Sequence, residues 1–127
     1  MTEEKYNEIE TIPIKDMNGW KISPKQKKFL EKIITLCDEK NIRLIFVTAP
    51  VSNVYFNRIK HYSVMHNQIA GIAKKNNIPY LDYNLLLAKE KLIPDDCFFD
   101  AGHLNNKGAI IAGDYFINWL NVTPTNH

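Results

Sequence analysis

The chain has 127 residues, of which 45% are apolar and 24% charged, and its formal net charge is +2. These values are typical of one folded domain, and they exclude an intrinsically disordered or low-complexity chain. The small net charge gives no reason to expect a nucleic-acid partner, and no run of about 18 apolar residues predicts a membrane-spanning segment.

The first 20 residues are polar and weakly patterned, and we interpret residues 1–20 as an N-terminal extension. The isoleucines between Ile9 and Ile14 suggest a short edge strand there, since Pro13 is unfavourable in a central strand. The start of residues 1–20 is acidic and lacks the features of a secretory signal. This predicts a cytosolic product, or an extracytoplasmic or cell-envelope location if the sequence belongs to a longer protein.

A helix is predicted from residue 24 to residue 40, because Ser23 fits the N-cap, Pro24 the first helical position and Gln26 a capping box. The next apolar run, 43–49, has no alternation of apolar and polar residues, which is typical of a strand buried on both faces of a parallel sheet. A second helix is predicted over about 56–75.

A second strand is expected over 78–83, followed by a brief helix at 85–87 and a loop at 94–103. Asn105 can cap a last helix over about 106–120. The residues expected to be buried by that helix are Ala109, Ala112, Phe116, Ile117 and Leu120. Residues 122–127 are interpreted as a disordered tail.

The alternation of helices and strands predicts an α/β domain over residues 21–121, built on a small or incomplete parallel sheet. Two strands alone are marginally stable, and the strand at 43–49 would leave one edge unpaired. Three elements could complete the sheet: the 9–15 segment, a second copy of the chain in a homo-oligomer, or a missing N-terminal half.

The carboxyl ends of parallel strands meet at one edge of the sheet, where active sites of open α/β sheets lie. Three segments should converge there: 50–53, 82–84 and 94–103. The last contains Asp100-Ala101-Gly102-His103. A carboxylate at Asp100 can accept the Nδ1–H of His103 and leave Nε2 free as a general base. Alternatively, both residues cap the final helix.

The run from Asp100 through His103-Leu104-Asn105 to Gly108, together with the preceding strand ending in Ala49-Pro50, resembles the C-terminal portion of SGNH (GDSL-type) hydrolases. The similarity extends over about residues 20–120, and it is greatest to the SGNH-like group of bacterial cell-envelope proteins. It implies a three-layer α/β/α sandwich of the flavodoxin-like kind. It also implies an esterase or acyltransferase acting on small acyl esters or acylated carbohydrates, with His103 as base and Asp100 as its orienting partner.

The family's Gly-Asp-Ser nucleophile motif and its Gly-x-Asn-Asp oxyanion motif are absent from this sequence. Ser52 is the remaining candidate for a nucleophile, and Asn53 could donate to an oxyanion. Cys97 is better interpreted as a small buried apolar residue. No cofactor motif or metal-ligand pattern is found. The sequence therefore predicts the C-terminal portion of a hydrolase, inactive by itself, or alternatively a non-catalytic binding or self-associating module.

Overall fold

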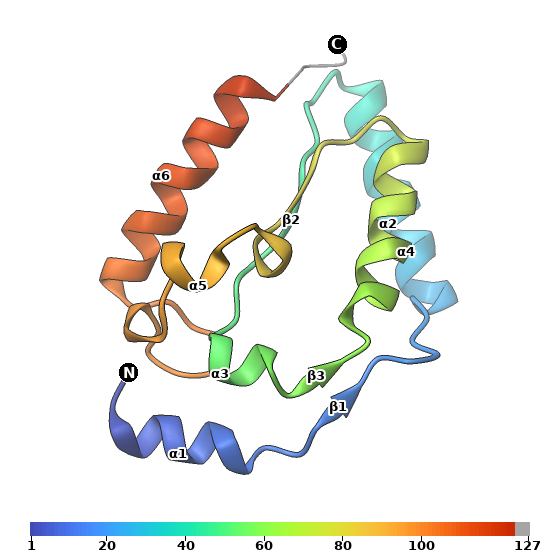
Figure 1. Ribbon diagram of the computed structural model, residues 1–127. Helices are drawn as coiled ribbons and strands as arrows, with labels where there is room; N and C mark the ends of the chain where they lie inside the picture. The colour runs from blue at the N-terminus through green and yellow to red at the C-terminus, as the bar shows by residue number, and fades with distance from the viewer. Residues whose placement is uncertain (124–127) are drawn as a thin grey trace.

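The computed structural model describes residues 1–123, and these residues form an α/β fold (Figure 1). The helices are α1 (Glu3–Thr11), α2 (Pro24–Glu39), α3 (Asn53–Phe56), α4 (Tyr62–Lys75), α5 (Lys89–Leu92) and α6 (Asn106–Val122). The strands are β1 (Lys15–Asp16), β2 (Phe46–Thr48), β3 (Ile59–Lys60) and β4 (Tyr80–Asp82). Two 3₁₀ turns, η1 (Tyr83–Leu85) and η2 (Asp95–Cys97), complete the order. Within the described residues no helix is long and apolar enough to cross a membrane.

Strands β2 and β4 pair in parallel, with Phe46 opposite Tyr80 and Thr48 opposite Asp82. Helix α6 lies on one side of this pair, and α2 and α4 lie on the other (Figure 1). The two sides receive alternate residues of β4: Leu81 joins the core beneath α6, while Asp82 meets α4. The predicted α/β class with a small parallel sheet is confirmed.

The first strand of the predicted pair is shorter than expected and is not buried on both faces. Only Phe46–Thr48 of the predicted 43–49 segment has strand geometry. Val47 remains 46% exposed, although Leu81, its neighbour in register, is only 3% exposed. The difference arises because helix α6 covers β4 and leaves β2 open on that face.

The N-terminal extension forms a helix and a two-residue strand, which the sequence interpretation did not foresee in this form. Helix α1 replaces the extended segment expected around Ile9, and Ile9 is its buried residue. Strand β1 pairs in parallel with β3, so it forms a separate two-stranded sheet and does not extend the β2–β4 pair. The expectation that the 9–15 segment completes the main sheet is therefore wrong.

The predicted helix over 56–75 is interrupted near its start. Residues Asn53–Phe56 form the short helix α3, residues 59–60 form β3, and α4 begins only at Tyr62. His61 precedes α4 in the left-handed conformation, with φ of 55°. A left-handed residue ends any continuous right-handed helix, so the segment divides at this position.

The predicted N-caps of helices α2 and α6 are confirmed. Ser23 and Gln26 form the capping box of α2, and Asn105 accepts a hydrogen bond from the Gly108 amide at the start of α6. Helix α6 buries Ala112, whereas Ala109 and Ile117, both expected in the core, are exposed. The expected disordered tail begins too early, because α6 runs to Val122; residues 124–127 lie outside the described part of the chain.

The best-buried part of the core lies between β4, the segment after it, and α6. Ile93, Cys97 and Phe98 are completely buried. They cluster with Leu81, Tyr83 and Ala112. Because Cys97 and Phe98 lie only a few residues before the Asp100–His103 loop, this core fixes the position from which that loop emerges.

Candidate active site

The Asp100–His103 loop is a tight turn closed by the backbone and by one carboxylate. The Phe99 amide donates to the His103 carbonyl (2.7 Å), and Phe98 and Leu104 form an isolated antiparallel bridge. Within the turn, Oδ1 of Asp100 accepts the amides of Gly102 (3.0 Å) and His103 (2.9 Å). These backbone contacts hold the Asp100 carboxylate in place independently of its contact with the imidazole.

The His103 imidazole is held by the same carboxylate. Its Nδ1 lies 2.8 Å from Oδ1 and 2.9 Å from Oδ2 of Asp100. A carboxylate at this position makes Nδ1 the donor, which leaves the Nε2 lone pair directed away from Asp100. The His103 side chain is 81% exposed, so Nε2 is accessible to solvent.

Hydrogen bonds from the Gly102 amide and from His103 lower the pKa of Asp100 below its ordinary range. Asp100 is therefore ionised at neutral pH, as an orienting carboxylate must be. Neither residue caps the final helix, because the N-cap side chain of α6 is that of Asn105. The alternative interpretation of the pair as a helix cap is wrong.

All three segments predicted to converge at the carboxyl ends of the strands do meet there. The Ser52 amide donates to the Ala101 carbonyl (2.8 Å), and the Val51 amide donates to Oδ1 of Asn84 (3.0 Å). Asn84 also donates through Nδ2 to the Ala49 carbonyl (3.0 Å). The end of β2 is thus joined to the segment after β4 on one side and to the His103 loop on the other.

Ser52 lies next to this loop but has a structural role in the described chain. The residue is completely buried, and its hydroxyl accepts the Tyr55 amide (3.4 Å) as the N-cap of α3. No hydrogen bond joins Ser52 Oγ to His103 among the described residues. In this conformation the hydroxyl cannot reach a substrate carbonyl.

Asn53 also makes hydrogen bonds within the fold, through both its side chain and its backbone. Its side-chain amide donates to the Ile93 carbonyl (3.1 Å), and its backbone amide donates to Oδ1 of Asp95 (2.6 Å). Asp95 also accepts the Val54 amide. The Asn53 side chain therefore connects α3 to the segment before η2, and one of its two N–H donors is used in this contact.

Cys97 behaves as predicted, because it is completely buried and burial raises the pKa of its thiol. A thiol with a raised pKa is a poor nucleophile at neutral pH. Among residues 1–123, no three His, Cys, Asp or Glu side chains are grouped closely enough to hold a metal ion.

The structure adds a buried polar cluster at the end of β4, which the sequence interpretation placed on this edge without recognising its partners. The Asp82 carboxylate accepts the Tyr62 hydroxyl (2.9 and 3.0 Å), His66 Nδ1 (2.9 Å) and the Asn84 amide (2.9 Å). The Tyr80 hydroxyl contacts both Asp82 (3.2 Å) and the Thr48 hydroxyl (2.7 Å). The only sequence signal was an aspartate near the carboxyl end of a predicted strand.

A buried lysine lies close to the same edge. Lys89 is 5% exposed, donates to the Val51 carbonyl (2.7 Å), and its Nζ stands 4.9 Å from the ring centroid of Phe56. Burial lowers the pKa of this ammonium group to about 8, although the charges of Asp95 and Asp82 partly oppose the shift. Lys89 therefore holds the backbone that precedes Ser52.

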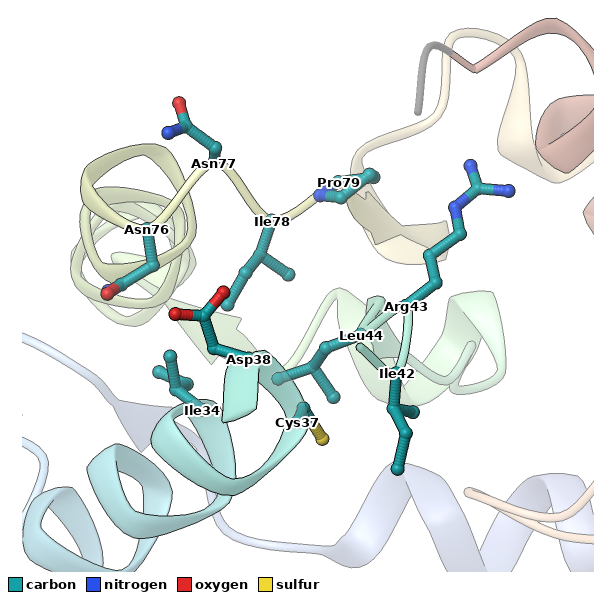
Figure 2. Close-up of a pocket in the computed structure, with 10 residues that line it drawn as sticks. All are labelled: Ile34, Cys37, Asp38, Ile42, Arg43, Leu44, Asn76, Asn77, Ile78 and Pro79. Atoms are coloured by element: carbon teal, nitrogen blue, oxygen red, sulfur yellow. The ribbon is translucent and has the colours of Figure 1, made fainter. Parts of the chain in front are cut away.

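A pocket of about 280 Å³ opens at the other end of the strands (Figure 2). It lies between the end of α2 and the segments 42–44 and 76–79, which precede β2 and β4. Its residues include Ile34, Cys37 and Asp38 of α2. The pocket is thus at the amino ends of the strands and separate from the Asp100–His103 loop.

Fold and site together define a small α/β protein with an exposed Asp–His pair at the carboxyl edge of its parallel strands. Residues 3–107 match the model of a family described as Protein of unknown function (DUF1574), and the chain belongs to that family. No curated protein matches the chain, and no solved structure matches it.

Proposed function

We propose that this chain carries the general base and the orienting carboxylate of an SGNH-type ester hydrolase or acyltransferase, of which it forms the C-terminal portion. The observation that carries the proposal is the contact of both Asp100 oxygens with His103 Nδ1, at 2.8 and 2.9 Å, while the ring remains open to solvent. Support also comes from the position of the pair at the carboxyl edge of the parallel strands.

The reaction requires a nucleophile from outside this chain, since Ser52 is buried and bonded within α3. A serine hydroxyl attacks the ester carbonyl while His103 Nε2 removes its proton, and Asp100 stabilises the imidazolium. The proton then passes to the leaving alcohol as the ester bond breaks. Water, or an acceptor hydroxyl, next attacks the acyl-enzyme with His103 again as base, which restores the serine.

The substrate class proposed is a small acyl ester or an acylated carbohydrate, and the corresponding location is the cell envelope. Neither the proposed base nor its carboxylate needs a metal or a cofactor for this chemistry. The exposed position of His103 suits a large substrate, because a polymer can reach a surface imidazole that a deep pocket would exclude.

The test is acetyl-ester turnover by the complete natural protein that contains this chain. His103→Ala should lower kcat by roughly 10²–10⁴-fold, the usual contribution of a general base. The matched control is His61→Ala, because His61 Nδ1 also contacts an exposed carboxylate, Asp16, at 2.7 Å, but from the β1–β3 sheet. Equal activity of wild type and His103→Ala would remove His103 from the mechanism.

A second function is favoured by the structural engagement of Ser52 and Asn53. Without a nucleophile, the chain would be a non-catalytic binding or self-associating module derived from the same fold. Turnover distinguishes the two: a module of this kind shows none above the background of the His103→Ala variant, while its binding or association persists in that variant.

A further inference from the structure

We propose that the free edge of β2 forms a two-fold interface with a second copy of this chain. The Phe46 amide donates to the Pro79 carbonyl (2.9 Å), so Phe46, and by the two-residue period Thr48, face β4. The backbone groups of Ile45 and Val47 therefore point to the opposite edge. No described residue pairs with them there, because the sheet contains only β2 and β4.

Apart from its short length of three residues, this edge lacks the features that protect exposed strands from pairing. Natural edge strands carry lysine, proline or a bulge, or are covered by a helix or loop. Residues 44–48 read Leu-Ile-Phe-Val-Thr and contain neither a charge nor a proline. The nearest charge, Arg43, is directed elsewhere, since its guanidinium donates to the Thr123 carbonyl (3.4 Å).

Exposed apolar side chains also occur on β2 itself and on helix α2. Val47 lies on the α6 side of the sheet, and helix α2 runs beside α4 on the other side (Figure 1). Three apolar residues of α2 at helical spacing are exposed. Ile42, at the start of this segment, is also exposed and lines the pocket of Figure 2. We call these residues the edge patch: Phe29, Ile33, Leu36, Ile42 and Val47, each about half exposed.

A second copy fits this surface because the surface is self-complementary. A two-fold axis perpendicular to the sheet sets β2 antiparallel to the same strand of the partner, so each free amide faces a free carbonyl of the same segment. The result is a four-stranded sheet in the order β4–β2–β2–β4, which exceeds the three strands that independent stability requires. Mixed parallel and antiparallel sheets of this kind are common.

Surface area and charge are compatible with such a dimer. Five large apolar side chains, each about half exposed, present on the order of 400 Å², and a standard interface buries about 800 Å² per partner with little more than half of it apolar. A net charge of +2 opposes association of two copies only weakly. The edge patch therefore supplies about the apolar area that a specific dimer needs.

The test measures the mass of the purified chain by sedimentation equilibrium over a range of concentrations. We expect a dimer, and we expect Val47→Lys to raise its dissociation constant at least about tenfold, because it places one lysine from each copy in the apolar interface. The matched control is Leu87→Lys, since Leu87 is fully exposed in the turn after η1. Circular dichroism verifies that both variants keep the fold.

Amide hydrogen exchange reports on the strand pairing itself. The amides of Ile45 and Val47 should become more protected as the protein concentration rises, because dimerisation gives them acceptors. A monomeric chain, a dimer that Val47→Lys leaves intact, or rapid exchange of both amides at concentrations where the dimer forms would each overturn the proposal. The outcome is distinguishable from that of the esterase proposal, because turnover depends on Asp100 and His103, and neither belongs to the edge patch.

Discussion

The backbone amide of Ser52 donates a 2.8 Å hydrogen bond to the carbonyl of Ala101. This contact joins the residue that follows the first strand of the main sheet to the turn that holds the Asp–His pair. Since Phe98 anchors the same turn in the core, the position of His103 is fixed from two sides. A surface imidazole thus has a defined position relative to the strand ends, which a freely moving loop would not provide.

Acid should release His103 from this position. The pKa of Asp100 is lowered in the folded chain, first by the Gly102 amide, so its stabilising effect is complete above the unfolded value near 3.9. It is lost as the pH falls through the lower folded value. We expect the amide proton resonances of Gly102 and His103 to move upfield in that range, as their hydrogen bonds to Asp100 weaken.

The measurement is a proton–nitrogen NMR titration from pH 6 to strongly acidic conditions, with circular dichroism as a check on global unfolding. The Gly113 amide, within α6, is the internal reference. Asp100→Ala should place both loop amides upfield already at pH 6. Unchanged shifts in that variant would show that the carboxylate does not order the turn.

Local sequence signals predicted correctly where helices α2 and α6 begin. The capping box of Ser23 and Gln26 and the Asn105 cap each involve residues three positions apart, so they can be recognised in any window of a few residues. The length of β2 could not be predicted in this way, because it is set by its partner β4, which offers only residues 80–82. The left-handed conformation of His61 could not be predicted, because no glycine or proline lies next to it in the sequence.

The candidate site likewise combines features that the sequence predicts with contacts that it does not predict. The rule that parallel strands end at one edge predicted that 50–53, 82–84 and 94–103 converge, and hydrogen bonds between these segments confirm it. The contacts of Tyr62 and His66 with Asp82 depend on how α4 lies over the sheet. That placement is a long-range property of the packed chain and has no pattern in the sequence.

Gly108 should be intolerant of any side chain. A Cβ at this position would lie below contact distance from the Cys97 carbonyl oxygen and close to a Leu104 methyl group. We expect Gly108→Ala to lower the free energy of unfolding by roughly 1–3 kcal/mol, since α6 must move away from the core. Urea denaturation measures the change.

Gly113→Ala, in the same helix, provides the control. A Cβ there meets no atom within 4 Å. Replacing glycine by alanine in an open helix interior stabilises by about 0.5–1 kcal/mol, so the two substitutions should have opposite signs. Equal effects at the two positions would contradict the close approach of Gly108 to Cys97.

Removal of the Tyr62 hydroxyl should destabilise the fold. In Tyr62→Phe, the buried Asp82 carboxylate loses a donor that contacts both of its oxygens, and Asn84 Nδ2 loses an acceptor at 3.2 Å. A buried polar group left without its partner costs about 1–3 kcal/mol. Tyr115→Phe is the control, because Tyr115 packs against the core without a hydrogen bond to any described residue. Urea denaturation of both variants should separate them by at least about 1 kcal/mol.

Lys89 should make the protein more stable as the pH rises from neutral to mildly alkaline. Burial lowers its pKa to about 8, whereas an unfolded lysine has a pKa near 10.4. Between these values the unfolded chain binds more protons than the folded chain, so the free energy of unfolding increases with pH. From pH 7 to pH 9.5 the gain from this group should be roughly 1–2 kcal/mol.

Lys89→Met should remove this gain, and urea denaturation of both proteins at the two pH values measures it. The Cys97 thiol, whose pKa burial raises, acts in the opposite direction, but it does so equally in wild type and variant. Lys91→Met, which changes an exposed lysine of the same helix, should keep the wild-type pH dependence. If wild type and Lys89→Met respond to pH alike, the Lys89 ammonium is not buried against the Val51 carbonyl as the structure has it.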